Sequence, residues 1–216
     1  MDKKVEIVSL GVNCLPRTFL TRNGIKPSKA QGELSCPFDL VKHPFDSIIY
    51  NLDNNFENYT DDLFFVLRKR FIFDFRQKGL WQKPDGTIFF HDKDCKAKDL
   101  DKLKTRITRR IENFRSITKS ERPVLFVICI YENTDKIEEL YTVLKTIRQD
   151  RKFTLAILNF SDKIIQTPNA YVLNLIPPYK NYSAKWNITR FVKSKLGQYI
   201  EHNISSFIQR IIEQEF

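Results

Sequence analysis

The amino-acid sequence predicts an α/β fold with a mostly parallel sheet and helices on both faces of that sheet. Residues 124–130 are apolar along their whole length, and residues 153–158 are apolar except at Thr154, as strands are when both faces of their sheet are covered. Between them, residues 135–149 carry apolar side chains at helical spacing. Strands that alternate with helices in this way are typical of a parallel sheet. We therefore expect a Rossmann-like, three-layer architecture.

The first elements along the chain are predicted to be a strand and a short helix. Residues 5–10 are expected to form a short buried strand that ends at a turn beginning with Gly11, and residues 15–22 follow as a helix. Pro16 lies in the first turn of that helix, where a missing N–H group costs nothing. Residues 25–37 contain several Pro, Gly and Ser residues and are expected to form a loop.

The middle of the chain predicts a helix at 44–52, a β-hairpin insertion and a longer helix. Residues 61–90 are aromatic and strand-forming, and the Pro-Asp-Gly sequence at 84–86 separates two apolar segments, as in a hairpin. Residues 100–117 repeat apolar side chains at spacings of three and four, which predicts an amphipathic helix. The remaining elements are expected as strands at 124–130, 153–158 and 171–176, a helix at 135–149, and a final helix with a break near Gly197.

Length and composition predict one soluble domain. A chain of 216 residues fits a single domain, because domains usually contain roughly 100–200 residues. The content of 42% hydrophobic and 13% aromatic residues excludes a disordered chain. We expect one domain over residues 1–216, with the C-terminal helix at about 186–214 packed on it. The first residues lack a signal peptide, and no apolar segment approaches the roughly 20 residues of a membrane span, so we expect a cytoplasmic protein.

The four cysteines are expected to be free thiols, because none of them forms a CxxC pair and disulfides are rare in a reducing compartment. Cys14 has the position that most strongly indicates chemistry, since it lies in the turn between the first strand and the first helix. The N-terminus of a helix stabilises a thiolate and lowers its pKa, as a nucleophilic cysteine needs. Backbone N–H groups at residues 13–15 are expected to stabilise an oxyanion. A buried structural thiol is the alternative interpretation.

A cysteine nucleophile needs a base, and the chain contains three histidines. His91 follows the apolar segment 88–90 and precedes Asp92, which places it at the end of a strand beside a carboxylate. A solvated loop histidine is the alternative interpretation. His43, before a proline, is interpreted as a loop residue, and His202 as a partly buried residue of the last helix.

Asp39 is the candidate acid of the site. It stands between two apolar residues, and a carboxylate that is buried there must find hydrogen-bond donors. Asp92 competes through its adjacency to His91, but neighbouring side chains of an extended segment point to opposite faces. We therefore assign Cys14, His91 and Asp39 to catalysis, and we assign Asp92 and Asn13 to binding.

The formal net charge of +10 is distributed unevenly. Residues 96–122 carry ten basic and four acidic side chains, and residues 179–210 carry six and one. Arg109 and Arg110 fall outside the apolar stripe of the predicted helix, so we expect them to project outward or toward the edge of a site and to bind an anionic partner. A solvated helix face is the alternative, and no nucleic-acid-binding module accompanies the charge.

Several common kinds of site are excluded by the motifs. The chain has six glycines and neither a GxGxxG nor a Walker sequence, so a conventional dinucleotide or phosphate loop is not expected. The spacing of the cysteines and His91 matches no compact zinc module. We therefore expect neither a metal nor a cofactor.

Five short motifs occur in an order that resembles a bacterial family of unknown function described as papain-like cysteine peptidases. They are SLGxNC at residues 9–14, PFD at 37–39, HD at 91–92, RRIENF at 109–114 and VLFV at 124–127. The resemblance covers about residues 7–160. It implies that Cys14 is the nucleophile, His91 the base and Asp39 the acid. The family's PFDW motif has Leu40 here in place of its Trp.

A papain-like α+β fold, which the resemblance implies, is the alternative to the parallel sheet. Our leading hypothesis is a cysteine-dependent hydrolase or acyltransferase in which Cys14 attacks an acyl carbon, His91 transfers the proton, and Asp39 orients the imidazole or holds the loop. The second hypothesis is a non-hydrolytic Rossmann-like enzyme or binding protein that recognises an anionic sugar or nucleotide through Arg109 and Arg110. The third is a basic scaffold that binds nucleic acid.

Overall fold

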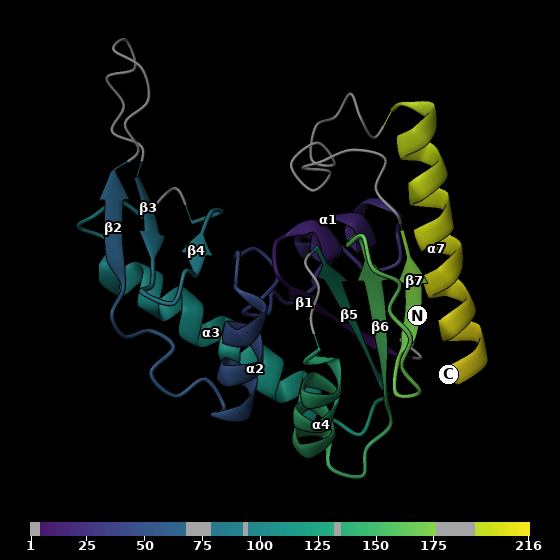
Figure 1. The fold of residues 1–216 in the computed structure, drawn as a ribbon. Helices are drawn as coiled ribbons and strands as arrows, with labels where there is room; N and C mark the ends of the chain where they lie inside the picture. The colour runs from purple at the N-terminus through teal and green to yellow at the C-terminus, as the bar shows by residue number, and fades with distance from the viewer. Residues whose placement is uncertain (1–4, 68–78, 93–94, 132–134, 176–192) are drawn as a thin grey trace.

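The computed structural model describes residues 5–67, 79–92, 95–131, 135–175 and 193–216, and its larger sheet is parallel (Figure 1). Four strands form this sheet in the order β1-β5-β6-β7. They are β1 (Glu6–Gly11), β5 (Val124–Ile130), β6 (Phe153–Asn159) and β7 (Tyr171–Asn174). Every neighbouring pair is parallel, so the carboxyl ends of all four strands lie at one edge of the sheet. The mostly parallel α/β sheet predicted from the sequence is confirmed.

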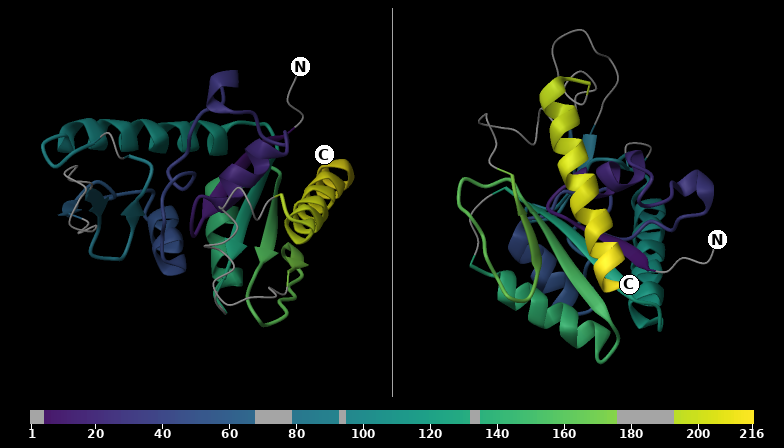
Figure 2. Two further views of the ribbon diagram at one scale, coloured as in Figure 1. Left: turned by 90° about the horizontal axis from the view of Figure 1, so that it is seen from above. Right: turned by 90° about the vertical axis from the view of Figure 1, so that its right-hand side faces the viewer.

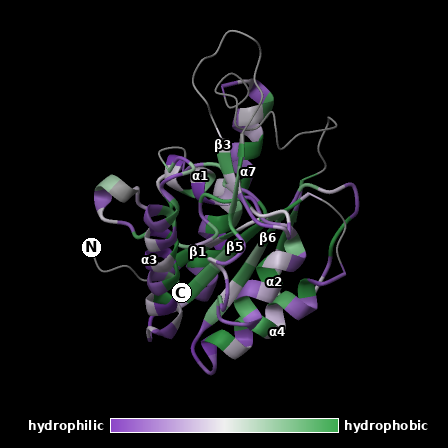
Figure 3. Cartoon of the chain, turned by 90° about the vertical axis from the view of Figure 1, so that its left-hand side faces the viewer, coloured by the Kyte–Doolittle hydropathy of each residue, from purple (hydrophilic) through white to green (hydrophobic). Residues whose placement is uncertain are grey.

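Helices pack on both faces of the parallel sheet (Figure 2). On one face, buried residues of α2 (Phe45–Asp53), α3 (Leu100–Lys119) and α4 (Ile137–Arg148) join one apolar cluster with the sheet. On the other face, α1 (Leu15–Arg22) and α7 (Lys195–Glu215) join a second cluster. The central strands β5 and β6 are almost entirely buried, and Figure 3 shows that they are mostly hydrophobic. Their uniform hydrophobicity therefore follows from burial on both faces.

A separate antiparallel sheet contains β2 (Phe64–Leu67), β3 (Gly79–Gln82) and β4 (Ile88–Phe89) in that order. The turn between β3 and β4 contains Gly86 at φ +88°, a conformation that favours glycine. The β-hairpin predicted there is confirmed, and β2 extends it to three strands. An isolated bridge between Lys42 and Ile88 connects this sheet to the segment that follows Asp39.

Most predicted boundaries agree with the structure to within two residues. The helix predicted at 15–22 is α1 without a shift, and α3 extends two residues beyond its predicted end. The expected break near Gly197 is wrong for the described part of α7, because Gly197 lies in its first turn and donates its N–H to the Ser194 hydroxyl at 3.1 Å. The predicted start of that helix, at 186–192, lies outside the described residues.

Arg148 forms hydrogen bonds to the segments that enter the two central strands, β5 and β6. Its side chain, at the end of α4, is fully buried. The guanidinium donates to the carbonyl oxygens of Ser120 and Arg122 at 3.0 and 2.9 Å, to that of Lys152 at 3.1 Å, and to that of Thr118. The end of α3 and the segments entering β5 and β6 are thus held by one side chain.

Candidate functional site

The turn after β1 places Cys14 at the carboxyl edge of the parallel sheet. Gly11 ends the strand, and a Cβ atom added there would lie 2.1 Å from the Asn13 carbonyl oxygen and 2.7 Å from that of Phe38. Both are main-chain atoms that cannot turn away, so the turn requires glycine at this position. The tight backbone brings Asn13 and Cys14 directly against the N-terminus of α1.

The side chain of Asn13 accepts a hydrogen bond from one of the N–H groups at the N-terminus of α1. Its Oδ1 atom accepts a hydrogen bond from the Leu15 N–H at 2.8 Å, while Cys14, the residue before the helix, makes no side-chain cap. The expectation that backbone N–H groups at residues 13–15 stabilise an oxyanion is therefore wrong for Leu15, whose N–H group is already paired. Asn13 contributes first to the shape of the turn.

The thiol of Cys14 differs from the sequence expectation in its acidity. Its pKa is raised, chiefly by burial, while hydrogen bonds from the Thr18 hydroxyl and from its own N–H group act in the opposite direction. The predicted lowering of this pKa is wrong because desolvation of the thiolate outweighs these donors. Cys14 is nonetheless only partly buried, unlike Cys36, Cys95 and Cys129.

The raised pKa predicts how Cys14 reacts with iodoacetamide. Because only the thiolate attacks, its alkylation rate should reach half of its maximum at a pH above the value for free cysteine, about 8.5. Mass spectrometry of the peptide that contains Cys14 measures the rate between pH 6 and 11. Thr18→Val should move the midpoint higher, since it removes a donor to the thiolate. A midpoint below 8 would show that the helix terminus dominates instead.

Asp39 is buried and fixes the loop beside β1. Its Oδ1 atom accepts a hydrogen bond from the Ser9 hydroxyl, and its Oδ2 atom accepts one from the Cys36 N–H at 2.8 Å. Ser9 belongs to β1, which is an edge strand of the sheet. Of the two roles expected for this carboxylate, these contacts correspond to holding the loop.

His91 and Asp92 have different environments although they are adjacent. His91 is exposed and lies two residues after β4, so the prediction that it follows a strand is confirmed. Asp92 is buried, and it accepts two hydrogen bonds from the Arg110 guanidinium, at 2.9 and 3.0 Å, and one from Arg106 at 2.8 Å. Asp92 thus attaches the antiparallel sheet to α3.

Arg109 and Arg110, the two basic residues predicted to act together on α3, have different environments. Arg110 is buried against Asp92, so of the two placements expected for it, outward or toward the edge of a site, the outward one is wrong. Arg109, the neighbouring residue, is exposed. Helical geometry explains the difference, because consecutive residues lie about 100° apart around the helix axis. Only Arg109 of the pair has its side chain directed away from the core.

His43 lies next to the Cys14 turn, a placement that the sequence pattern did not indicate. Its side chain is fully buried, its main-chain N–H group donates to the Val12 carbonyl at 3.1 Å, and its Nε2 atom lies 2.6 Å from the Tyr59 hydroxyl. Burial lowers its pKa to about 3, so the imidazole is neutral at ordinary pH. The residue before a proline resembled a loop histidine, and only the packing of Phe38 and Tyr59 around it reveals its place.

At the other end of the carboxyl edge, after β6 and β7, the polar side chains hydrogen-bond one another and the neighbouring loops. Asn159 donates from Nδ2 to the Asn174 Oδ1 atom at 2.7 Å, and its own Oδ1 atom accepts from the N–H and hydroxyl groups of Ser161. Asn174 in turn bonds the main chain of Ile165. These polar side chains are used in fixing the loops after β6 and β7. The edge formed by β1 and β5 is therefore the better candidate for chemistry.

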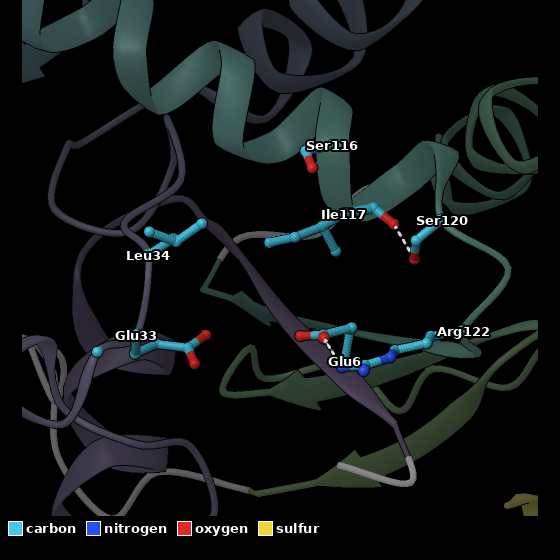
Figure 4. Close-up of a pocket in the computed structure, with 8 residues that line it drawn as sticks. Glu6, Glu33, Leu34, Ser116, Ile117, Ser120 and Arg122 are labelled. Carbon is cyan, nitrogen blue, oxygen red and sulfur yellow. Dashed lines mark hydrogen bonds and ion pairs between the residues drawn. The ribbon is translucent and has the colours of Figure 1, made fainter. Parts of the chain in front are cut away.

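A pocket of about 310 Å³ lies at the amino end of β1, on the side away from Cys14 (Figure 4). Glu6 and Arg122 lie side by side in its lining and form an ion pair, with 3.2 Å between Oε1 and Nη1. Among the described residues, no group of three or more His, Cys, Asp or Glu side chains could hold a metal ion. No described helix combines the length and apolarity that crossing a membrane requires.

Fold and site together define an α/β protein with a cysteine between the first strand of a parallel sheet and the first helix. Residues 5–169 match the model of the family described as "Putative papain-like cysteine peptidase (DUF1796)", so the chain belongs to that family. The resemblance found in the sequence motifs is thereby confirmed. No curated protein and no solved structure matches the chain.

Proposed function

We propose that the chain is a cysteine-dependent hydrolase or acyltransferase with Cys14 as its nucleophile. The observation that carries the proposal is the position of Cys14, which is partly exposed at the carboxyl end of β1 and at the start of α1, in a family described as peptidases of this class. Sites in parallel α/β sheets commonly lie at the carboxyl ends of the strands. We retain the three-layer, Rossmann-like description of the scaffold as part of this proposal.

The raised pKa of Cys14 means that its proton must be removed for reaction near neutral pH. We assign that role to His91, the exposed histidine that the family resemblance places as base. The Cys14 sulfur forms a bond to the acyl carbon, the proton passes to His91, and the leaving group departs with that proton. Water or another acceptor then takes the acyl group from the sulfur. Asp39 supports the reaction through the loop that it ties to β1.

The exposed Arg109 is proposed to favour an anionic group on the substrate. The alternative of an anion-binding protein that uses Arg109 and Arg110 together loses support, since Arg110 is engaged by Asp92. The remaining interpretation of Arg109 is a solvated position on α3.

Hydrolysis of p-nitrophenyl acetate tests the proposed function. We expect the wild-type chain to form an acyl-enzyme at Cys14, detected by mass spectrometry, and Cys14→Ala to abolish it. Cys95→Ala is the matched control, because Cys95 is buried and has no role in the reaction. His91→Ala should slow acylation at pH 7 and recover part of the rate at high pH. An acylation rate that is unchanged in Cys14→Ala would overturn the proposal.

A further inference from the structure

Tyr131 is brought beside the Cys14 turn by the register of the sheet. Gly11 pairs with Cys129 across β1 and β5, so Asn13 and Tyr131, two residues further along each strand, occupy corresponding positions beyond the strand ends. On the other side of Tyr131, its ring stacks on Phe160 with the centroids 5.4 Å apart and the planes at 12°. The ring is therefore held in one orientation, with its hydroxyl group toward the β1 turn, where the side chain of Asn13 lies next to it.

The Tyr131 hydroxyl is buried and completes no hydrogen bond of normal geometry among the described residues. A buried hydroxyl whose hydrogen bonds are incomplete is unfavourable, so such a group calls for an explanation. Asn13 and Cys129 are the side chains within its hydrogen-bonding reach, but their contacts with it fall outside normal hydrogen-bond geometry, and the thiol of Cys14 is close enough to act on its charge. Burial raises the pKa of Tyr131 well above its usual value, which keeps the O–H donor intact at any working pH.

A donor is needed here because the Leu15 N–H group is already bonded to Asn13. We propose that the Tyr131 hydroxyl donates a hydrogen bond to the acyl oxygen of the group that Cys14 attacks. The inference rests on the proposed function and adds a catalytic residue to the same site. When the sulfur bonds to the acyl carbon, the π electron pair of the C=O bond moves onto the oxygen. Tyr131 then holds that oxyanion until the C=O bond re-forms and the leaving group departs.

Tyr131→Phe is the appropriate variant, since it removes only the hydroxyl and keeps the ring that stacks on Phe160. Two probes separate the possible roles of the hydroxyl. Acylation of Cys14 by p-nitrophenyl acetate passes through an oxyanion, whereas alkylation by iodoacetamide displaces iodide without one. We expect Tyr131→Phe to slow acylation by about 10²-fold, as the loss of one oxyanion donor does in other enzymes, and to leave the alkylation rate within twofold of wild type. Tyr199→Phe, on the exposed side of α7, is the matched control.

Each other outcome has a separate meaning. If Tyr131→Phe slows acylation and alkylation equally, the hydroxyl only shapes the turn and the inference is wrong. An unchanged acylation rate in Tyr131→Phe, with acylation still abolished in Cys14→Ala, would overturn the inference and leave the proposed function standing. Acylation that is absent from the wild-type chain, or that survives in Cys14→Ala, would overturn the proposed function itself.

Discussion

Replacing Arg110 by methionine is expected to lower the free energy of unfolding by about 3 kcal/mol. Methionine keeps most of the apolar stem of arginine and removes both of its hydrogen bonds to the buried Asp92 carboxylate. Breaking one side of a buried ion pair costs about 3–5 kcal/mol, because a charge remains without compensation. The lower end of that range applies here, since Arg106 retains its contact with Asp92 at 2.8 Å. Urea denaturation followed by circular dichroism measures the change.

Arg109→Met is the matched control for this prediction. Arg109 is the preceding residue of the same helix and is exposed, so its replacement should change the free energy of unfolding by no more than about 0.5 kcal/mol. Adding Asp92→Asn to Arg110→Met should restore part of the loss, because it removes the uncompensated charge. Equal losses in the two single variants would contradict the arrangement described for Asp92.

Replacing Arg148 by methionine is expected to lower the free energy of unfolding by about 4 kcal/mol. The variant leaves four main-chain carbonyl groups around the buried guanidinium without their donor. Each hydrogen bond to a charged group contributes about 1.5–3 kcal/mol, and water that enters the space can satisfy some of the carbonyls. The same denaturation measurement applies.

Arg151→Met controls for the loss of a positive charge near the same turn. Arg151 forms an ion pair with the exposed Glu121 at 2.7 Å, and exposed pairs of this kind contribute about 0–1 kcal/mol. Arg148→Lys keeps the charge but lacks the planar fork, so it should fall between wild type and Arg148→Met. A loss in Arg148→Met no larger than that in Arg151→Met would show that the carbonyl contacts add little.

The elements with a clear hydrophobic period could be predicted from the sequence. The strands at 124–130 and 153–158 and the helix at 15–22 have the bounds expected, within one residue, because burial on both faces and a Pro near a helix start leave local patterns. The order of strands across the sheet follows from no such local pattern. The pairing of β2 with β3 in the antiparallel sheet also follows from no local pattern, because β3 begins twelve residues after β2 ends.

The position of Cys14 between a strand and a helix could be predicted from the sequence, whereas the contacts around it could not. The turn between strand and helix is a local feature, and it identified the residue. The partners of Asp39, Asp92 and Arg110 depend on segments that meet only in the folded chain, as when Ser9 meets Asp39 across 30 positions. The pKa of Cys14 likewise depends on how deeply the turn is buried, which residue types do not show.

Because β1 pairs with β5, the first strand cannot join the sheet until most of the chain up to β5 has been synthesised. Glu6 pairs with Val124, a separation of 124 − 6 = 118 positions. At a synthesis rate of about 5–20 residues per second, β1 therefore waits roughly 6 to 24 s on the ribosome before its partner strand exists. During that interval Ile7, Val8 and Leu10 can bury themselves only against segments that precede β5, and α1 and the loop that ends at Asp39 are the first of these to be made. The Ser9–Asp39 contact, available long before β5 is synthesised, gives the nascent strand an early native partner.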